Sequence, residues 1–250
     1  MRLKIIRINP PLRKLSGLAW LLLTGGALTA QGQSAAGQSG AEMQANVKSL
    51  VAGLPAVVPV ATPEMKGSPY VFQRWLPAHL TLSNKLPLAP VLLKYDVLHQ
   101  RLLMRADFTS RDSLQLSDQL VTSFTLDEPA AGAAPARQRL FRRFGDAPDL
   151  RNRNAYVEVL HQSRYALLKQ YVKVLHAANF QDAYSSHLDE VEDREYYFLR
   201  RPDAHVIPVK LNAKALAAAA PELAAKLNVA STTAKTEADW VAALEAADPR

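Results

Sequence analysis

Hydrophobic and polar residues alternate with a period of two over much of the chain after residue 77. Apolar side chains occupy every second position in residues 78–82, 93–97 and 102–108. Such alternation places one set of side chains on a buried face of a strand and the other toward water. Similar patterns predict further strands at residues 121–126, 137–144, 155–161, 165–175, 194–200 and 205–211.

Three short polar segments, residues 98–100, 162–164 and 202–203, separate neighbouring strands by hairpin distances. The chain has no regular alternation of strands and helices, which a parallel sheet would require. We therefore expect a mainly β (α+β) fold: an antiparallel β-sheet sandwich or a partly closed barrel of roughly eight strands.

Helix signals are concentrated at the C-terminal end, in residues 212–250. The side chain of Asn212 can cap a helix over residues 213–219, and Pro221 suits the first turn of a second helix ending near Leu227. A third helix is predicted to follow Thr236, because apolar residues recur after it at helical spacing. These residues are Trp240, Val241, Leu244 and Ala247. These helices predict a short C-terminal appendage packed on the sheet.

Residues 1–30 have the three parts of a cleavable signal peptide. Five basic residues begin the chain, an apolar run covers residues 18–28, and the segment 27–30 provides the exit, although Leu28 is larger than the small residue preferred three positions before cleavage. We expect cleavage after Ala30 or two residues later. An uncleaved anchor is the alternative, but the run is shorter than the roughly 20 residues that span a bilayer. Residues 31–65, rich in small and polar residues and then in proline, predict a flexible or extended linker to a β domain at 66–211.

Cysteine content and charge narrow the function classes. The chain has no cysteine, which excludes disulfides and the lipid-bearing cysteine of a bacterial lipoprotein. Its net charge of +7 falls to +2 after loss of residues 1–30, because 25 basic and 23 acidic side chains remain. The basic pI therefore gives little support to a nucleic-acid partner. We expect an exported protein, periplasmic or secreted, with no transmembrane segment after cleavage.

The order of several segments is similar to a known family. Residues 67–70 and Trp75 are followed by residues 93–97, 156–160, 166–171 and 194–199, and then by the capped helices. Over residues 66–248 this order resembles an uncharacterised family of small exported Bacteroidota proteins, although Ser163 and Arg164 stand where that family has a glycine. The resemblance implies export and a β-rich domain with C-terminal helices, and no activity.

Candidate catalytic and metal residues are few. His176, His187 and Asp189 fall in one segment between strands and are weak candidates for a metal site, because their spacing matches no metal motif. The chain has no GxSxG, GxGxxG or Walker-type motif. We expect no cofactor, and the sequence favours a non-catalytic protein over an enzyme.

The most distinctive charged segment carries Arg137, Arg139, Arg142 and Arg143. These residues predict either a patch for an anionic lipid, polysaccharide or acidic partner, or an exposed edge strand whose charges prevent aggregation. The leading hypothesis is an exported envelope protein with a binding or structural role. The alternatives are a periplasmic carrier of a small apolar ligand, with a pocket lined by residues such as Leu93, Tyr95, Leu102 and Met104, and a hydrolase.

Overall fold

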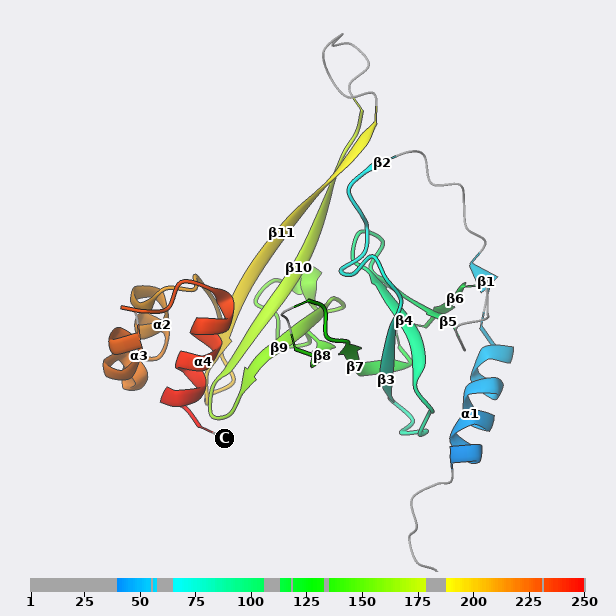
Figure 1. The fold of residues 1–250 in the computed structure, drawn as a ribbon, viewed down its shortest axis with the longest axis horizontal. Helices are drawn as coiled ribbons and strands as arrows, with labels where there is room; N and C mark the ends of the chain where they lie inside the picture. Colours follow the sequence, from blue (N-terminus) through cyan, green and yellow to red (C-terminus); the bar gives the residue numbers. More distant parts are fainter. Residues whose placement is uncertain are drawn as a thin grey trace, which may run out of the picture. The chain divides into compact units, whose positions relative to one another are not determined.

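The computed structural model describes residues 40–54, 56–57, 65–105, 113–117, 119–132, 135–178, 188–230 and 232–249. The predicted signal peptide lies outside these residues. The described chain forms one large sheet and four helices, shown in Figure 1. None of its helices has the length and apolar character needed to cross a bilayer.

The described residues form twelve strands, against the roughly eight expected. They are β1 (Ala56–Val57), β2 (Met65–Lys66), β3 (Leu76–Leu82), β4 (Val91–Asp96), β5 (Arg101–Arg105), β6 (Ser113–Leu116), β7 (Val121–Glu128), β8 (Arg137–Arg143), β9 (Tyr156–Gln162), β10 (Ala166–His176), β11 (Asp189–Arg200) and β12 (Val206–Val209). The additional strands β1, β2 and β6 have two to four residues, too short to display alternation.

The mainly β fold is confirmed, and the sheet is open rather than closed into a barrel. Its strand order is β1-β6-β5-β4-β3-β7-β8-β9-β10-β11-β12, and β2 pairs with β11. All pairs among the described strands are antiparallel except β2 with β11, which is parallel. The hairpins β4–β5, β9–β10 and β11–β12 form where the polar segments predict them.

The sheet curls strongly, so that distant strands meet across its concave face. The backbone N–H of Tyr156 on β9 donates to the hydroxyl of Tyr95 on β4 at 3.1 Å, although three strands separate them in the sheet. The Tyr156 hydroxyl donates to the carbonyl of Val121 on β7 at 2.9 Å. Phe124 and Phe141 stack between these strands with ring centres 4.9 Å apart. This concave face holds the main core.

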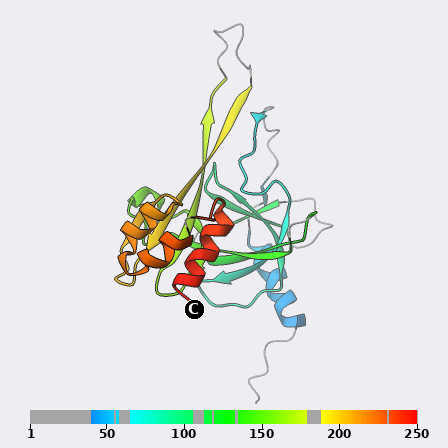
Figure 2. The same cartoon turned by 60° about the vertical axis from the view of Figure 1, so that its left-hand side comes forward.

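The predicted C-terminal helices are confirmed as α2 (Ala213–Ala219), α3 (Ala224–Ala230) and α4 (Glu237–Ala247). Asn212 caps α2, and Thr236 forms a capping box with Asp239 at α4. Figures 1 and 2 show the three helices grouped beside β10 and β11. They share a second core with Leu167 and Leu199 of these strands.

The expectation of a flexible or extended linker over residues 31–65 is wrong for residues 40–52, which form helix α1 (Gly40–Ala52). Its apolar side chains follow helical spacing, and Val47 is buried against the concave core. The many small and polar residues of this region made the apolar positions that pack against the core hard to recognise. These positions are Met43, Val47, Leu50, Val51 and Leu54.

Gly67 follows β2 at a point where no larger residue fits. Its φ of +97° is rare for other residues, and an added Cβ would lie 2.6 Å from the Val191 carbonyl oxygen on β11. Gly67→Ala is expected to lower the free energy of unfolding by about 1–3 kcal/mol in urea denaturation. Gly145→Ala is the control, because no atom lies within 4 Å of its added Cβ. Equal losses in the two variants would contradict this account of Gly67.

Candidate functional site

The predicted arginines lie on β8, between β7 and β9 in the sheet order. The edge-strand interpretation is wrong for Arg142, which pairs with both neighbouring strands, whereas in the described chain residues 137–140 pair with β7 alone. All four have partners within the chain. Arg137 Nε lies 2.7 Å from Glu128, and Arg142 forms a two-bond pair with Asp146 at 2.9 and 3.0 Å. Arg143 donates to two backbone carbonyls. These contacts satisfy much of the charge that appeared as a patch in the sequence.

Arg139 is the fourth arginine and lies in a buried network that joins three strands. Its Nε donates to Glu158 on β9 at 2.7 Å, and the Tyr171 hydroxyl on β10 donates to the same carboxylate at 2.6 Å. The side chains of Arg139 and Glu158 are only 7% and 5% exposed. Burial, followed by the negative charge of Glu158, raises the pKa of Tyr171. Tyr171 is thus held as a neutral donor and is unsuited to acid–base catalysis near neutral pH.

A second polar cluster joins β10 and β11 to α4. Lys169 Nζ lies 2.7 Å from Glu237 and 2.9 Å from Glu195, and the Tyr197 hydroxyl donates to Glu237 at 2.7 Å. Burial and the hydrogen bond to Glu237 raise the pKa of Tyr197. Burial opposes ionisation of Glu237, but hydrogen bonds from Lys169 and Tyr197 outweigh it and hold the pKa of Glu237 below its ordinary value. The cluster fastens α4 to the sheet.

Acid is therefore expected to weaken the attachment of α4. A carboxylate whose pKa is lower in the folded state stabilises the fold above its ordinary pKa, here 4.5, and loses that contribution as the pH falls through its folded value. Amide hydrogen exchange in α4 should accelerate as the pH falls below 4.5, beyond the intrinsic change in exchange rate.

Glu237→Gln is the matched control for this acid effect. The glutamine side chain cannot ionise, so this variant should lose the part of the pH dependence of α4 exchange that Glu237 contributes. Lys169 and Glu195 remain in place. Identical pH profiles of α4 exchange in the native protein and Glu237→Gln would contradict the assignment.

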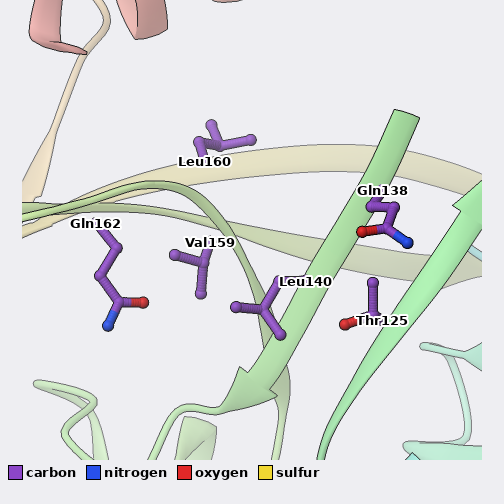
Figure 3. A pocket seen from close by; sticks show the side chains of 6 residues that line it. All are labelled: Thr125, Gln138, Leu140, Val159, Leu160 and Gln162. Atoms are coloured by element: carbon purple, nitrogen blue, oxygen red, sulfur yellow. The ribbon is translucent and has the colours of Figure 1, made fainter. Parts of the chain in front are cut away.

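A cleft opens where β8 and β9 part. Their ladder covers only Phe141–Arg143 against Tyr156–Glu158, while β8 stays paired with β7 along residues 137–142. Beyond the ladder lies an open volume of about 510 Å³, lined by Thr125, Gln138, Leu140, Val159, Leu160 and Gln162. Figure 3 shows these side chains around the separating strands.

The composition of this cleft indicates what it can bind. None of the described side chains that line it is charged. Leu160 lies at a β-bulge of β9 and packs against the core shared with the C-terminal helices. Val159 packs against the separate cluster of Phe144 and Leu168, so the two side chains lie on opposite faces of the strand. Both can line one cleft only if it lies at the strand edge. In the described chain, residues 137–140 of β8 have no ladder partner on the β9 side. An extended backbone is the group that completes such an edge.

The weak metal candidates do not assemble in the described residues. His176 Nε2 lies 2.9 Å from Glu192, and Asp189 accepts a hydrogen bond from the Ala178 backbone N–H. His187 lies outside the described residues. Over the part of the chain that is described, no group of three or more His, Asp or Glu side chains could hold a metal ion.

The residues expected to line a carrier pocket are core residues. Leu93, Tyr95, Leu102 and Met104 are at most 3% exposed and pack in the concave core. A separate open pocket of about 640 Å³ lies where β12 ends beside β11, and its lining includes Tyr196, Pro208, Val209 and Leu211.

Sequence reasoning missed the buried network and the cleft. Glu158 and Lys169 carried a usable signal, because each is a charged residue inside an apolar strand, as is typical of a paired buried charge. Gln138, Leu140 and Val159 carried none, since the parting of β8 and β9 depends on long-range pairing. Comparisons of the chain with family models, curated proteins and solved structures found no match.

Proposed function

We propose that this chain is an exported, non-catalytic binding protein of the envelope, and that the β8–β9 cleft receives an extended segment of a partner protein. The carrying observation is the cleft itself, where a strand edge lies beside an uncharged opening of about 510 Å³. Pairing with a sheet edge supplies backbone hydrogen bonds, and neighbouring pockets select the side chains. The uncharged lining favours a segment with apolar and neutral polar side chains.

The state of the ionisable groups supports a binding role. Glu158 and Lys169 are engaged in ion pairs, and the raised pKa values of Tyr171 and Tyr197 keep these hydroxyls protonated. Groups arranged in this way stabilise the fold and are poor nucleophiles or general bases.

A displayed library of random linear peptides, selected on the purified protein, tests the binding role. Leu140→Arg is expected to weaken the selected peptides at least about tenfold, because a charge would enter an uncharged cleft. The control is Leu150→Arg, since Leu150 is 70% exposed and does not line the cleft. Equal affinity of both variants, failure to select any peptide, or turnover by dialysed protein on a hydrolase panel would overturn the proposal.

The export component rests on the basic start, apolar run and small-residue end of residues 1–30. N-terminal sequencing of the protein from the envelope fraction is expected to begin shortly after Ala30. A mature chain beginning at Met1 would contradict export by cleavage.

The second candidate function is a carrier of a small apolar ligand, favoured by the pocket beside β11 and β12. Its volume of about 640 Å³ falls in the range of small-molecule sites, and most of its lining residues are apolar or aromatic. Fluorescent fatty-acid binding that is lost in Val209→Asp, while Leu140→Arg binds normally, would favour this candidate over the cleft.

A further inference from the structure

Two cations lie close together on β4 and β5, on the faces turned away from the concave core. Leu93 and Tyr95 of β4 are in the core, so Lys94 between them points to the opposite face. On β5, Arg105 pairs with Leu92, which shares that face with Lys94. Both cations are half-buried.

Two aromatic rings hold these cations. Lys94 Nζ lies 4.5 Å from the centre of the Tyr70 ring and 5.4 Å from that of Trp75. Arg105 Cζ lies 4.4 Å from the centre of the same Trp75 ring. A cation–π contact positions a cation without supplying a counter-charge. The Trp75 ring therefore contacts both cations.

Neither cation has a carboxylate in ion-pair contact within the described residues, and the buried Nε–H of Arg105 has no acceptor there. Other arginines of this sheet do have carboxylate partners. Arg101, also on β5, lies 2.9 Å from Asp96, and Arg139 lies 2.7 Å from Glu158. Lys94 and Arg105 thus form a local excess of positive charge.

This arrangement is costly without a ligand. Burial, followed by the positive charge of Arg105, lowers the pKa of Lys94. A buried donor without an acceptor also destabilises the fold. An anion between Lys94 and Arg105 would offset their repulsion and accept the Nε–H of Arg105.

We propose that Lys94, Arg105 and Trp75 form a binding site for a phosphate group. Phosphate offers up to two negative charges and several acceptor oxygens, which match the fork of N–H donors of Arg105 and the ammonium of Lys94. The rings of Trp75 and Tyr70 provide an apolar wall for the carbon part of a phosphate ester. The group comes either as free phosphate or as a lipid headgroup. This site does not depend on the function proposed for the β8–β9 cleft.

The test follows the ¹⁵N resonances of the Arg105 Nε–H and the Trp75 indole N–H in the full protein. One arm titrates inorganic phosphate against sodium chloride at equal ionic strength. The other measures co-sedimentation with phosphatidylglycerol vesicles and with phosphatidylcholine vesicles. We expect saturable shifts at both resonances in the first arm, or selective sedimentation with phosphatidylglycerol in the second. Saturation by inorganic phosphate identifies free phosphate as a source, and selective sedimentation alone identifies the lipid headgroup.

Lys94→Gln and Arg105→Gln are expected to weaken the response at least about tenfold, with the Trp75 indole as the common readout. Lys214→Gln, an exposed lysine on α2, is the matched control and should respond like the native protein. Absence of saturable binding in both arms, or equal responses of all three variants, would overturn the proposal.

Discussion

Glu158→Ala is expected to lower the free energy of unfolding by about 3–5 kcal/mol, because it leaves a buried arginine without its main counter-charge. The side chain of Arg139 is 7% exposed, and its Nε lies 2.7 Å from the Glu158 carboxylate. Its next carboxylate, on Glu128, is at 3.5 Å. The Tyr171 hydroxyl would also lose the acceptor that it now contacts at 2.6 Å. Urea unfolding followed by circular dichroism measures the loss.

The double variant Glu158→Leu with Arg139→Met separates the cost of an unpaired charge from the contribution of the pair. Apolar side chains of similar size often replace a buried ion pair without loss, so this variant should be clearly more stable than Glu158→Ala. Glu190→Ala is the surface control, because the side chains of its ion pair with Lys66 are 48% and 67% exposed, and little change is expected. A double variant as unstable as Glu158→Ala would contradict the account.

Local signals in the sequence predicted the local structure well. The hairpin between β9 and β10 follows from alternation on both sides of residues 162–164, and the Asn212 and Thr236 caps follow from the side chains themselves. In each case the residues that determine the geometry lie within a few positions of one another. The hairpin and the two caps therefore need no contact with a distant part of the sequence.

Long-range pairing explains what the sequence did not predict. β2 pairs with β11 more than 120 residues later, through the two-residue match of Met65 and Lys66 with Asp189 and Glu190. The β8–β9 cleft similarly depends on where a ladder stops. The arginines illustrate the same point for charge. Their sequence position indicated a patch, whereas partners from other strands and loops, such as Glu128, Asp146 and Glu158, decide which charges are compensated.

Trp240→Ala is expected to be similarly damaging, at about 3–5 kcal/mol, because it opens a cavity in the core shared by the sheet and the C-terminal helices. Trp240 is 5% exposed on α4, and its cluster includes Leu167 and Leu199, both fully buried on β10 and β11. The helices thus cover apolar side chains of two neighbouring strands near one end of the sheet. Urea unfolding and amide exchange of β10 and β11 measure the effect.

Val229→Ala on α3 is the matched control, because Val229 is 74% exposed and its truncation creates no cavity. If the helices belong to the cooperative unit of the sheet, Trp240→Ala should raise exchange in β10, β11 and α4 together. Acid loosening of the Glu237 contact should instead raise exchange mainly in α4, since the apolar contacts of Trp240 remain. Increased exchange confined to α4 in Trp240→Ala would contradict a shared unit, and would make residues 212–250 a separable appendage.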